Sequence, residues 1–319
     1  MKKLMTALVV GVLATAAPVL AGSLMKTQIS GTANWVVHLD YEGFNASRIG
    51  QLIREELKAQ GIEAQLENFT TVFGFHPLND VRDVTLYGQG KQPEKAVVLI
   101  DGNFNKETLL ALVRMNPMYE ETEHNGVPIH RWLHEENKAG QHKEQMMYGC
   151  LYNDKLVVIS TGLEAVKGAV DVLKGQMTNA TAGAVFGQSI LETTGAFLLA
   201  AASGVSQMVG EEPKAAALRQ TDELSLAIGE ADGNFYVDLG LKAKTEEAAT
   251  NISKVLNGII AFMSMAGEEQ PKLAELAQKL QLSCTNSTVQ IHFGADSKSV
   301  FDFFKEQWEK NKQADQQTQ

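Results

Sequence analysis

The sequence predicts an α+β fold of two related halves, each built from antiparallel strands with covering amphipathic helices. Three observations support this prediction. Strand-like and helix-like segments recur in the same order in both halves, hairpin signals join neighbouring strands, and the chain has only two cysteines among 319 residues. Two cysteines do not make a disulfide framework, so the fold must rest on a hydrophobic core.

Each half starts with an apolar strand followed by a helix. Residues 35–40 (WVVHLD) are typical of the first strand, and apolar residues spaced three and four apart between Ile49 and Leu57 indicate the helix. Residues 196–201 repeat the strand in the second half. The helix expected after this second strand is interrupted by a glycine and a proline.

Two hairpins, each followed by a helix, complete each half. Asn105 is placed to cap the helix after the first hairpin, and Asp232-Gly233 is a strong turn signal in the second half. The expected strand pairs are 84–88 with 96–100, 148–152 with 156–159, 224–228 with 235–239, and 283–285 with 288–293.

These pieces divide the chain into four parts. The two halves join in a polar stretch between Gly175 and Gly187, and the residues after Trp308 are polar enough to be disordered. The predicted parts are a signal peptide at 1–21, a first half at 22–178 with an inserted hairpin at about 118–147, a second half at 179–308, and a disordered tail at 309–319.

The N-terminus has the pattern of a secretory signal peptide. Lys2 and Lys3 precede an apolar run from Leu4 to Leu20, and small residues end the run at Ala21. The alternative is a membrane anchor, but a run of about 17 residues is at the lower limit for a span. We therefore expect cleavage after Ala21 and an exported protein, either periplasmic or secreted.

Composition limits the partners of the mature protein. Removal of Lys2 and Lys3 leaves 26 of the 28 basic residues against 38 acidic ones, a net charge of about −12. This balance repels nucleic acid, so we predict no such partner. No later segment approaches the ~20 apolar residues of a membrane helix, so we expect a soluble protein with no membrane span.

The strand segments WVVHLD at 35–40 and VTLYG at 84–88, with the interrupted two-half plan, resemble a group of uncharacterised exported proteins of the Planctomycetes and Verrucomicrobia. The resemblance covers most of the mature chain. It implies export and carries no catalytic residues, so it adds nothing about chemistry.

No segment contains a catalytic or cofactor motif. Residues 88–91 (GQGK) are too short for a phosphate-binding loop, and no serine has the flanking glycines of a nucleophile elbow. His130 and His134 have the spacing of a zinc protease motif, but Arg131 replaces the required glutamate. We therefore predict no cofactor and no catalytic residue, although a dispersed site among the 38 acidic residues is left open.

The predicted hairpin at 118–147 interrupts the repeat, because the second half has only a short helix at the equivalent place. Asn125-Gly126 indicates the turn, and His130, Trp132 and His134 share one face of the second strand. An exposed tryptophan between histidines suits contact with a partner, so this strip is a candidate interaction surface. The alternative is that Trp132 packs against a neighbouring helix.

Three other groups allow two interpretations each. Histidines and methionines of the insertion form a copper-compatible ligand set, but solvated histidines and core methionines are the ordinary explanation, and no metal site is predicted. Cys150 and Cys284 occupy equivalent places in the halves, and form either a disulfide or two buried thiols. His38 and Asp40 share a strand face, either as a functional pair or as a polar pair near solvent or a helix end. The histidines and methionines of the copper-compatible set are His124, His130, His134, His142, Met115, Met118, Met146 and Met147.

Three classes of function remain. The first is a non-enzymatic envelope protein that binds a protein or small ligand through its sheet or inserted hairpin. The second is a carrier of an apolar ligand such as lipid, and the third is an enzyme with dispersed residues. A carrier requires a large apolar site, an enzyme requires convergent titratable groups, and a binding module requires an exposed apolar patch.

Overall fold

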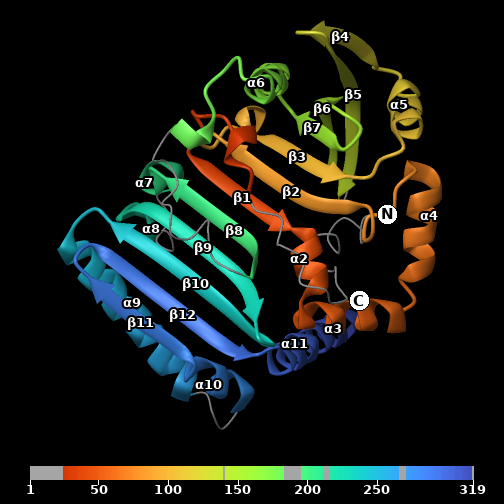
Figure 1. The fold of residues 1–319 in the computed structure, drawn as a ribbon. Helices are drawn as coiled ribbons and strands as arrows, with labels where there is room; N and C mark the ends of the chain where they lie inside the picture. Colours follow the sequence, from red (N-terminus) through yellow and green to blue (C-terminus); the bar gives the residue numbers. More distant parts are fainter. Residues whose placement is uncertain (1–23, 139–140, 183–194, 211–215, 266–270, 318–319) are drawn as a thin grey trace.

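A computed structural model places the twelve strands of the described residues in one sheet, with every neighbouring pair antiparallel (Figure 1). The structure describes residues 24–138, 141–182, 195–210, 216–265 and 271–317. Strands and helices are both abundant, which confirms the α+β prediction. The predicted signal peptide and residues 183–187 of the predicted join lie outside the described residues.

The strands are β1 Trp35–Asp40, β2 Val81–Gly88, β3 Val97–Gly102, β4 Glu120–His124, β5 Val127–Lys138, β6 Gln141–Leu151, β7 Leu156–Ser160, β8 Ala196–Ser203, β9 Thr221–Ala231, β10 Asn234–Ala243, β11 Leu280–Thr285 and β12 Thr288–Asp296. The α-helices are α2 Tyr41–Ala46, α3 Arg48–Ala59, α4 Glu63–Phe73, α5 Lys106–Arg114, α6 Leu163–Leu173, α7 Val205–Met208, α8 Ala216–Arg219, α9 Glu246–Met265, α10 Pro271–Ala277 and α11 Ser297–Gln317. Short 3-10 turns are Lys26–Gln28, Pro93–Lys95 and Ala180–Ala182.

The sheet joins its two sides through β1 and β8. Reading outward from this seam, one side has the order β1-β2-β3-β7-β6-β5-β4 and the other has β8-β9-β10-β12-β11. The first five strands of each side therefore follow the same order along the chain, and β5 and β4 are additional on one side. Superposition of the two halves in three dimensions stays a prediction.

Local signals explain the turns and helix starts. Three of the predicted turns adopt left-handed backbone, with positive φ at Asn125 and Gly126, at Asp232 and Gly233, and at Asn286. The Asn105 side chain accepts a hydrogen bond from the Thr108 amide at 3.0 Å, which confirms the predicted cap of α5.

One face of the sheet carries the main core. Val36, Leu99 and Val158 are at most 1% exposed on this face, and Val166 and Val170 of α6 are completely buried against them. Trp35 and Val37 of β1 alternate with Val36, so they point to the opposite face, and both are half-buried.

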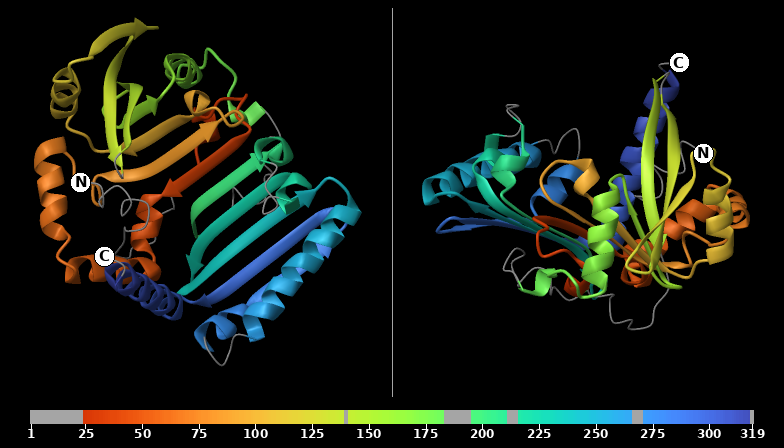
Figure 2. Two further views of the ribbon diagram at one scale, coloured as in Figure 1. Left: turned by 180° about the vertical axis from the view of Figure 1, so that it is seen from behind. Right: turned by 90° about the horizontal axis from the view of Figure 1, so that it is seen from above.

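The opposite face meets helices at its margins. Helix α9 packs Ala249 and Ile252 against Leu241 and Val289 at one end of the strands. Helices α2, α3 and α11 pack at the other end, where Phe44, Ile53 and Val300 meet β8, β9 and β12. Viewed from the side on which α9 lies, these helices surround the strands and the middle of the sheet is visible between them (Figure 2, left).

The C-terminal tail differs from its prediction. We expected residues 309–319 to be disordered, but α11 extends to Gln317. The tail lacks glycine and proline and contains four Gln and two Lys, which favour helix, so a polar composition did not exclude helical structure. Among the described residues, no helix has the length and apolar character needed to cross a membrane.

Candidate functional site

A continuous apolar row crosses the open face of the sheet. The register places one residue from each of nine consecutive strands side by side, and each is apolar and half-buried. Directly opposed residues of antiparallel strands point to the same face. This first row consists of Leu282, Ile291, Leu239, Leu226, Ala200, Val37, Leu86, Val98 and Ile159.

A second row runs parallel to the first, two residues along each strand. It includes one residue from each of ten consecutive strands, and all ten are apolar and half-buried. We call the two rows together the apolar face. The second row consists of Leu280, Phe293, Val237, Ile228, Leu198, Leu39, Val84, Ile100, Val157 and Leu151.

The apolar face lies between helices that expose further large apolar side chains. Val255, Ile259 and Phe262 recur at helical spacing on α9 and are 60%, 50% and 76% exposed. No charged residue occurs from Val255 to Met265. On α11, Phe304 and Trp308 are likewise exposed. Clusters of this kind on a folded surface usually mark a binding site.

The other face of the same strands is polar in the second half. His292 Nδ1 lies 2.6 Å from Asp238 Oδ1, above a shallow hollow of about 450 Å³ that Tyr236 also lines. Burial and the Asp238 carboxylate raise the pKa of Tyr236 to about 12. This high pKa keeps the phenol protonated at neutral pH, which does not suit a general base.

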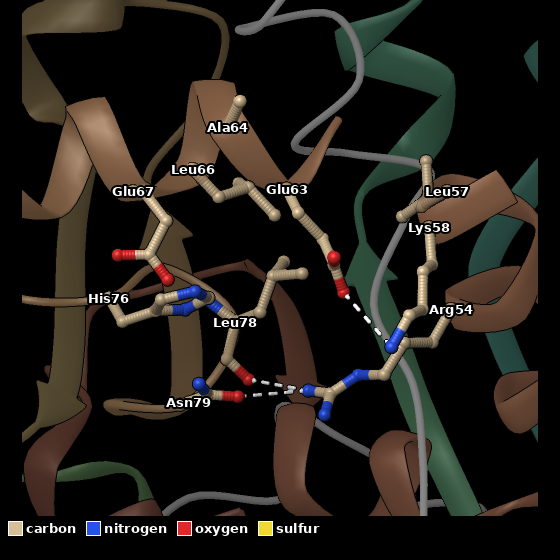
Figure 3. A pocket seen from close by; sticks show the side chains of 10 residues that line it. All are labelled: Arg54, Leu57, Lys58, Glu63, Ala64, Leu66, Glu67, His76, Leu78 and Asn79. Atoms are coloured by element: carbon tan, nitrogen blue, oxygen red, sulfur yellow. Dashed lines mark hydrogen bonds and ion pairs between the residues drawn. The ribbon is translucent and has the colours of Figure 1, made fainter. Parts of the chain in front are cut away.

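A second hollow, of about 350 Å³, lies between α3 and α4 (Figure 3). Arg54 Nη2 donates hydrogen bonds to Leu78 O and Asn79 Oδ1, and Lys58 forms an ion pair with Glu63 at 3.7 Å. These polar contacts connect the two helices to the segment before β2. The basic groups are thus engaged by the protein itself, and the hollow has a structural explanation.

The predicted interaction strip on β5 is only partly exposed. His130 is 5% exposed, Trp132 is half-buried and His134 is exposed. The Trp132 ring lies over Gly149 of β6, where an added Cβ would be 3.1 Å from the ring. The three side chains share one face as predicted, but Tyr119 stacks on His130 and Trp132 lies against β6.

His130 belongs to a hydrogen-bond network at this edge of the sheet. Its Nδ1 lies 3.0 Å from Tyr119 Oη, and that hydroxyl donates to Glu121 Oε2 at 2.6 Å. Arg114 Nη2 donates to the same carboxylate at 3.2 Å. Burial is the main cause of a lowered pKa at His130, so the ring is neutral at pH 7 and holds α5 against β4 and β5.

The hairpin tip contacts helix α6. Asn125 and Gly126 are exposed as expected, but His124 Nε2 lies 2.7 Å from Asp171 Oδ1 and Lys174 Nζ donates to Asn125 O. These contacts attach the tip to the end of α6. No group of three or more metal-ligating side chains occurs within the described residues, and the side chain of His142 is outside them.

The two cysteines are free thiols, so the disulfide interpretation is wrong for this structure. Cys150 is buried in β6 and Cys284 is exposed in β11, with eight strands between them. Neighbouring strands are ~4.8 Å apart, which separates the two thiols by tens of ångströms. Because the two cysteines occupy equivalent places in the two halves, they lie towards opposite edges of the sheet.

The polar pair in β1 is buried on the covered face. His38 and Asp40 are 2% and 1% exposed, and His38 Nδ1 lies 2.8 Å from Thr85 Oγ1. Asp40 Oδ1 accepts a hydrogen bond from the Gly43 amide at 2.9 Å and caps α2. The helix-end interpretation therefore explains Asp40, and the solvent-facing interpretation is wrong.

Sequence reasoning did not find the apolar face. Its signal was present, because the strands of the seam are apolar at successive positions, so both of their faces carry apolar side chains. We interpreted such runs as strands covered by helices. Only the register across ten strands shows that one of the two faces is left half-open.

Comparisons with known proteins leave the family open. No protein-family model and no curated protein sequence matches the chain. Similar solved structures are crystal forms III, IV and I of TP0453, a Treponema protein, at 8%, 7% and 8% identity and TM-scores of 0.46, 0.42 and 0.40. They cover 88%, 89% and 88% of this chain and 98%, 97% and 96% of those chains. The resemblance to Planctomycetes and Verrucomicrobia proteins stays a prediction.

Proposed function

We propose that this protein is an exported, non-enzymatic carrier that holds an apolar ligand, such as the acyl chain of a lipid, against the apolar face. The observation that carries the proposal is the pair of apolar rows across nine and ten consecutive strands, in which members such as Leu86 and Val98 are only half-buried and belong to none of the core clusters. A surface of this kind is costly in water unless a ligand covers it.

The shape of the apolar face suits an elongated ligand. Nine strands at ~4.8 Å spacing give the first row a length of roughly 40 Å. Helix α9 packs over Leu239 and Leu282 at one end of the first row, and α2, α3 and α11 pack around Leu198, Ile228 and Phe293 of the second row. The ligand would lie along the remaining members of the two rows. The two hollows described above, of about 350 and 450 Å³, are much shorter than the rows and offer less apolar contact to an elongated ligand.

Binding of a fluorescent fatty acid to the purified protein tests the proposal. Leu226→Asn places an amide in the middle of the first row, and Ser225→Asn places the same group on the opposite face of the same strand. A leucine contact contributes about 1.5–3 kcal/mol, so Leu226→Asn should weaken binding about tenfold or more. Ser225→Asn should bind like the unmodified protein.

Two results would overturn the proposal. One is the absence of saturable binding by the unmodified protein to any of a series of fatty acids and phospholipids. The other is equal weakening by both variants, which would place the ligand elsewhere. Thermal unfolding of both variants separates a loss of binding from a loss of fold.

A further inference from the structure

The two edges of the sheet differ in how they are protected. Strand β4 forms one edge and contains Glu120, Glu121 and Glu123, all exposed. Charged side chains of this kind prevent an edge from pairing with another strand. Strand β11 forms the other edge, with the sequence LQLSCT, and contains no charged residue and no proline. One edge is thus protected and the other is open to pairing.

The open edge presents a defined set of backbone groups. The two-residue turn at Asn286 and Ser287 makes Thr285 and Thr288 a hydrogen-bonded pair, and such pairs alternate along an antiparallel ladder. The amides and carbonyls of Leu280, Leu282 and Cys284 therefore point away from β12. No hydrogen bond from another described segment reaches them.

We propose that β11 pairs with β11 of a second copy of this chain, antiparallel and about a two-fold axis at Leu282. In this register Leu282 faces its own copy, and Leu280 faces Cys284 of the second chain. All outward amides and carbonyls of the three residues then find partners, as the isologous contact of a two-fold dimer requires. The inference goes beyond the carrier function and does not depend on it.

Charge and surface chemistry favour a second copy as the partner. Pairing about Leu282 brings together only neutral residues, although the whole chain has a net charge of −10. Leu282 is also the last member of the first apolar row. Leu282 packs against the cluster that α9 forms with β10 and β12, so the two-fold axis brings α9 of both copies to the same face of a continuous sheet.

Sedimentation equilibrium of the purified protein under reducing conditions tests the proposal. We expect a mass of two chains, and about the same dissociation constant for Cys284→Ser, which keeps the amide. Cys284→Pro removes the outward amide but no hydrogen bond to β12, so it should raise the dissociation constant about tenfold or more. A single-chain mass at 100 µM, or an unaltered dimer with Cys284→Pro, would overturn the proposal.

A second measurement reports the register and remains valid if Cys284→Pro fails to fold. In a Cys284→Ser background, Leu282→Cys places the two new thiols opposite each other, and mild oxidation should link the chains. Gln281→Cys in the same background is the matched control, because the two alpha carbons would be roughly 8 Å apart, beyond disulfide reach. Equal linking of both variants, or an open series of oligomers from pairing of β11 with β4, would overturn the two-fold arrangement.

Discussion

His38 Nδ1 lies 2.8 Å from Thr85 Oγ1 at the centre of the twelve-stranded sheet, and both residues are buried on its covered face. Thr85→Val keeps the side-chain shape and removes the hydroxyl, which leaves a ring nitrogen of His38 without this partner. The expected cost is about 1–3 kcal/mol of unfolding free energy. Urea unfolding measures it, and Thr85→Ser should restore most of the stability. Equal stability of Thr85→Val and the unmodified protein would contradict the contact.

Neighbouring residues of β3 distinguish the two faces of the sheet. Leu99 is 1% exposed on the covered face, whereas Val98 is half-buried in the first apolar row. Leu99→Ala should destabilise the protein by about 2–5 kcal/mol, because it leaves a cavity in the core. Val98→Ala should cost less than about 1 kcal/mol. Similar losses for both variants in chemical denaturation would mean that both faces are covered.

The carboxyl group of Asp83 predicts a dependence of stability on pH. Burial, and secondarily the nearby Asp101 carboxylate, raise its pKa to about 6, with Arg82 opposing the shift. The folded protein then binds a proton more tightly than the unfolded chain, so this group lowers stability as pH rises from about 4 through 6. Asp83→Asn should add about 1–3 kcal/mol at pH 7.5 and little at pH 4. Urea unfolding at both pH values tests this, and an equal change at both would refute it.

The two thiols should differ in reactivity. Cys284 is exposed, whereas Cys150 is buried and its pKa is raised to about 12 by that burial. An aromatic disulfide reagent should titrate one thiol in the folded protein and two after unfolding in guanidinium. Reaction of no thiol in the unfolded, unreduced protein would instead indicate a disulfide.

Trp132 provides the remaining test of the inserted hairpin. Its ring covers Gly149, so Trp132→Ala should lower stability by about 1–3 kcal/mol through lost packing. Exposed His134 is the matched control, and His134→Ala should leave the melting temperature within about 2 °C. An unaltered melting temperature for Trp132→Ala, with loss of a co-purifying partner, would restore the strip as an interaction surface.

Local chemistry was sufficient to predict the hairpins. Asn125-Gly126 and Asp232-Gly233 occur at turns because few other residues tolerate left-handed backbone, so a short sequence determines the structure. The covered face of β1 could not be predicted in this way. Val36 and Val37 are the same residue type, and only contacts with distant strands and with α6 decide which of them is buried.

The apolar face could not be predicted from the sequence for the same reason. Each strand contributes one or two ordinary apolar residues to the apolar face, such as Leu226 or Leu86, and none forms a motif. The property arises from alignment across ten strands, which depends on every turn length and on the β bulges between them. His130 and Trp132 were conspicuous in sequence, yet His130 is buried and the half-buried Trp132 lies over Gly149 of the neighbouring strand.

The seam between β1 and β8 has a consequence for the order of assembly. Asn34 Nδ2 donates to Ser203 O across 169 residues of chain, whereas β2, β3, β6 and β7 find their partners much sooner. During folding, β1 has one unpaired edge until β8 joins it. Late closure of a distant pair is slow, and until it occurs the chain exposes an apolar strand edge in the middle of the future sheet. Aggregation should therefore start from partly folded chains in which β8 has not yet paired with β1, and a holding chaperone would act on that species.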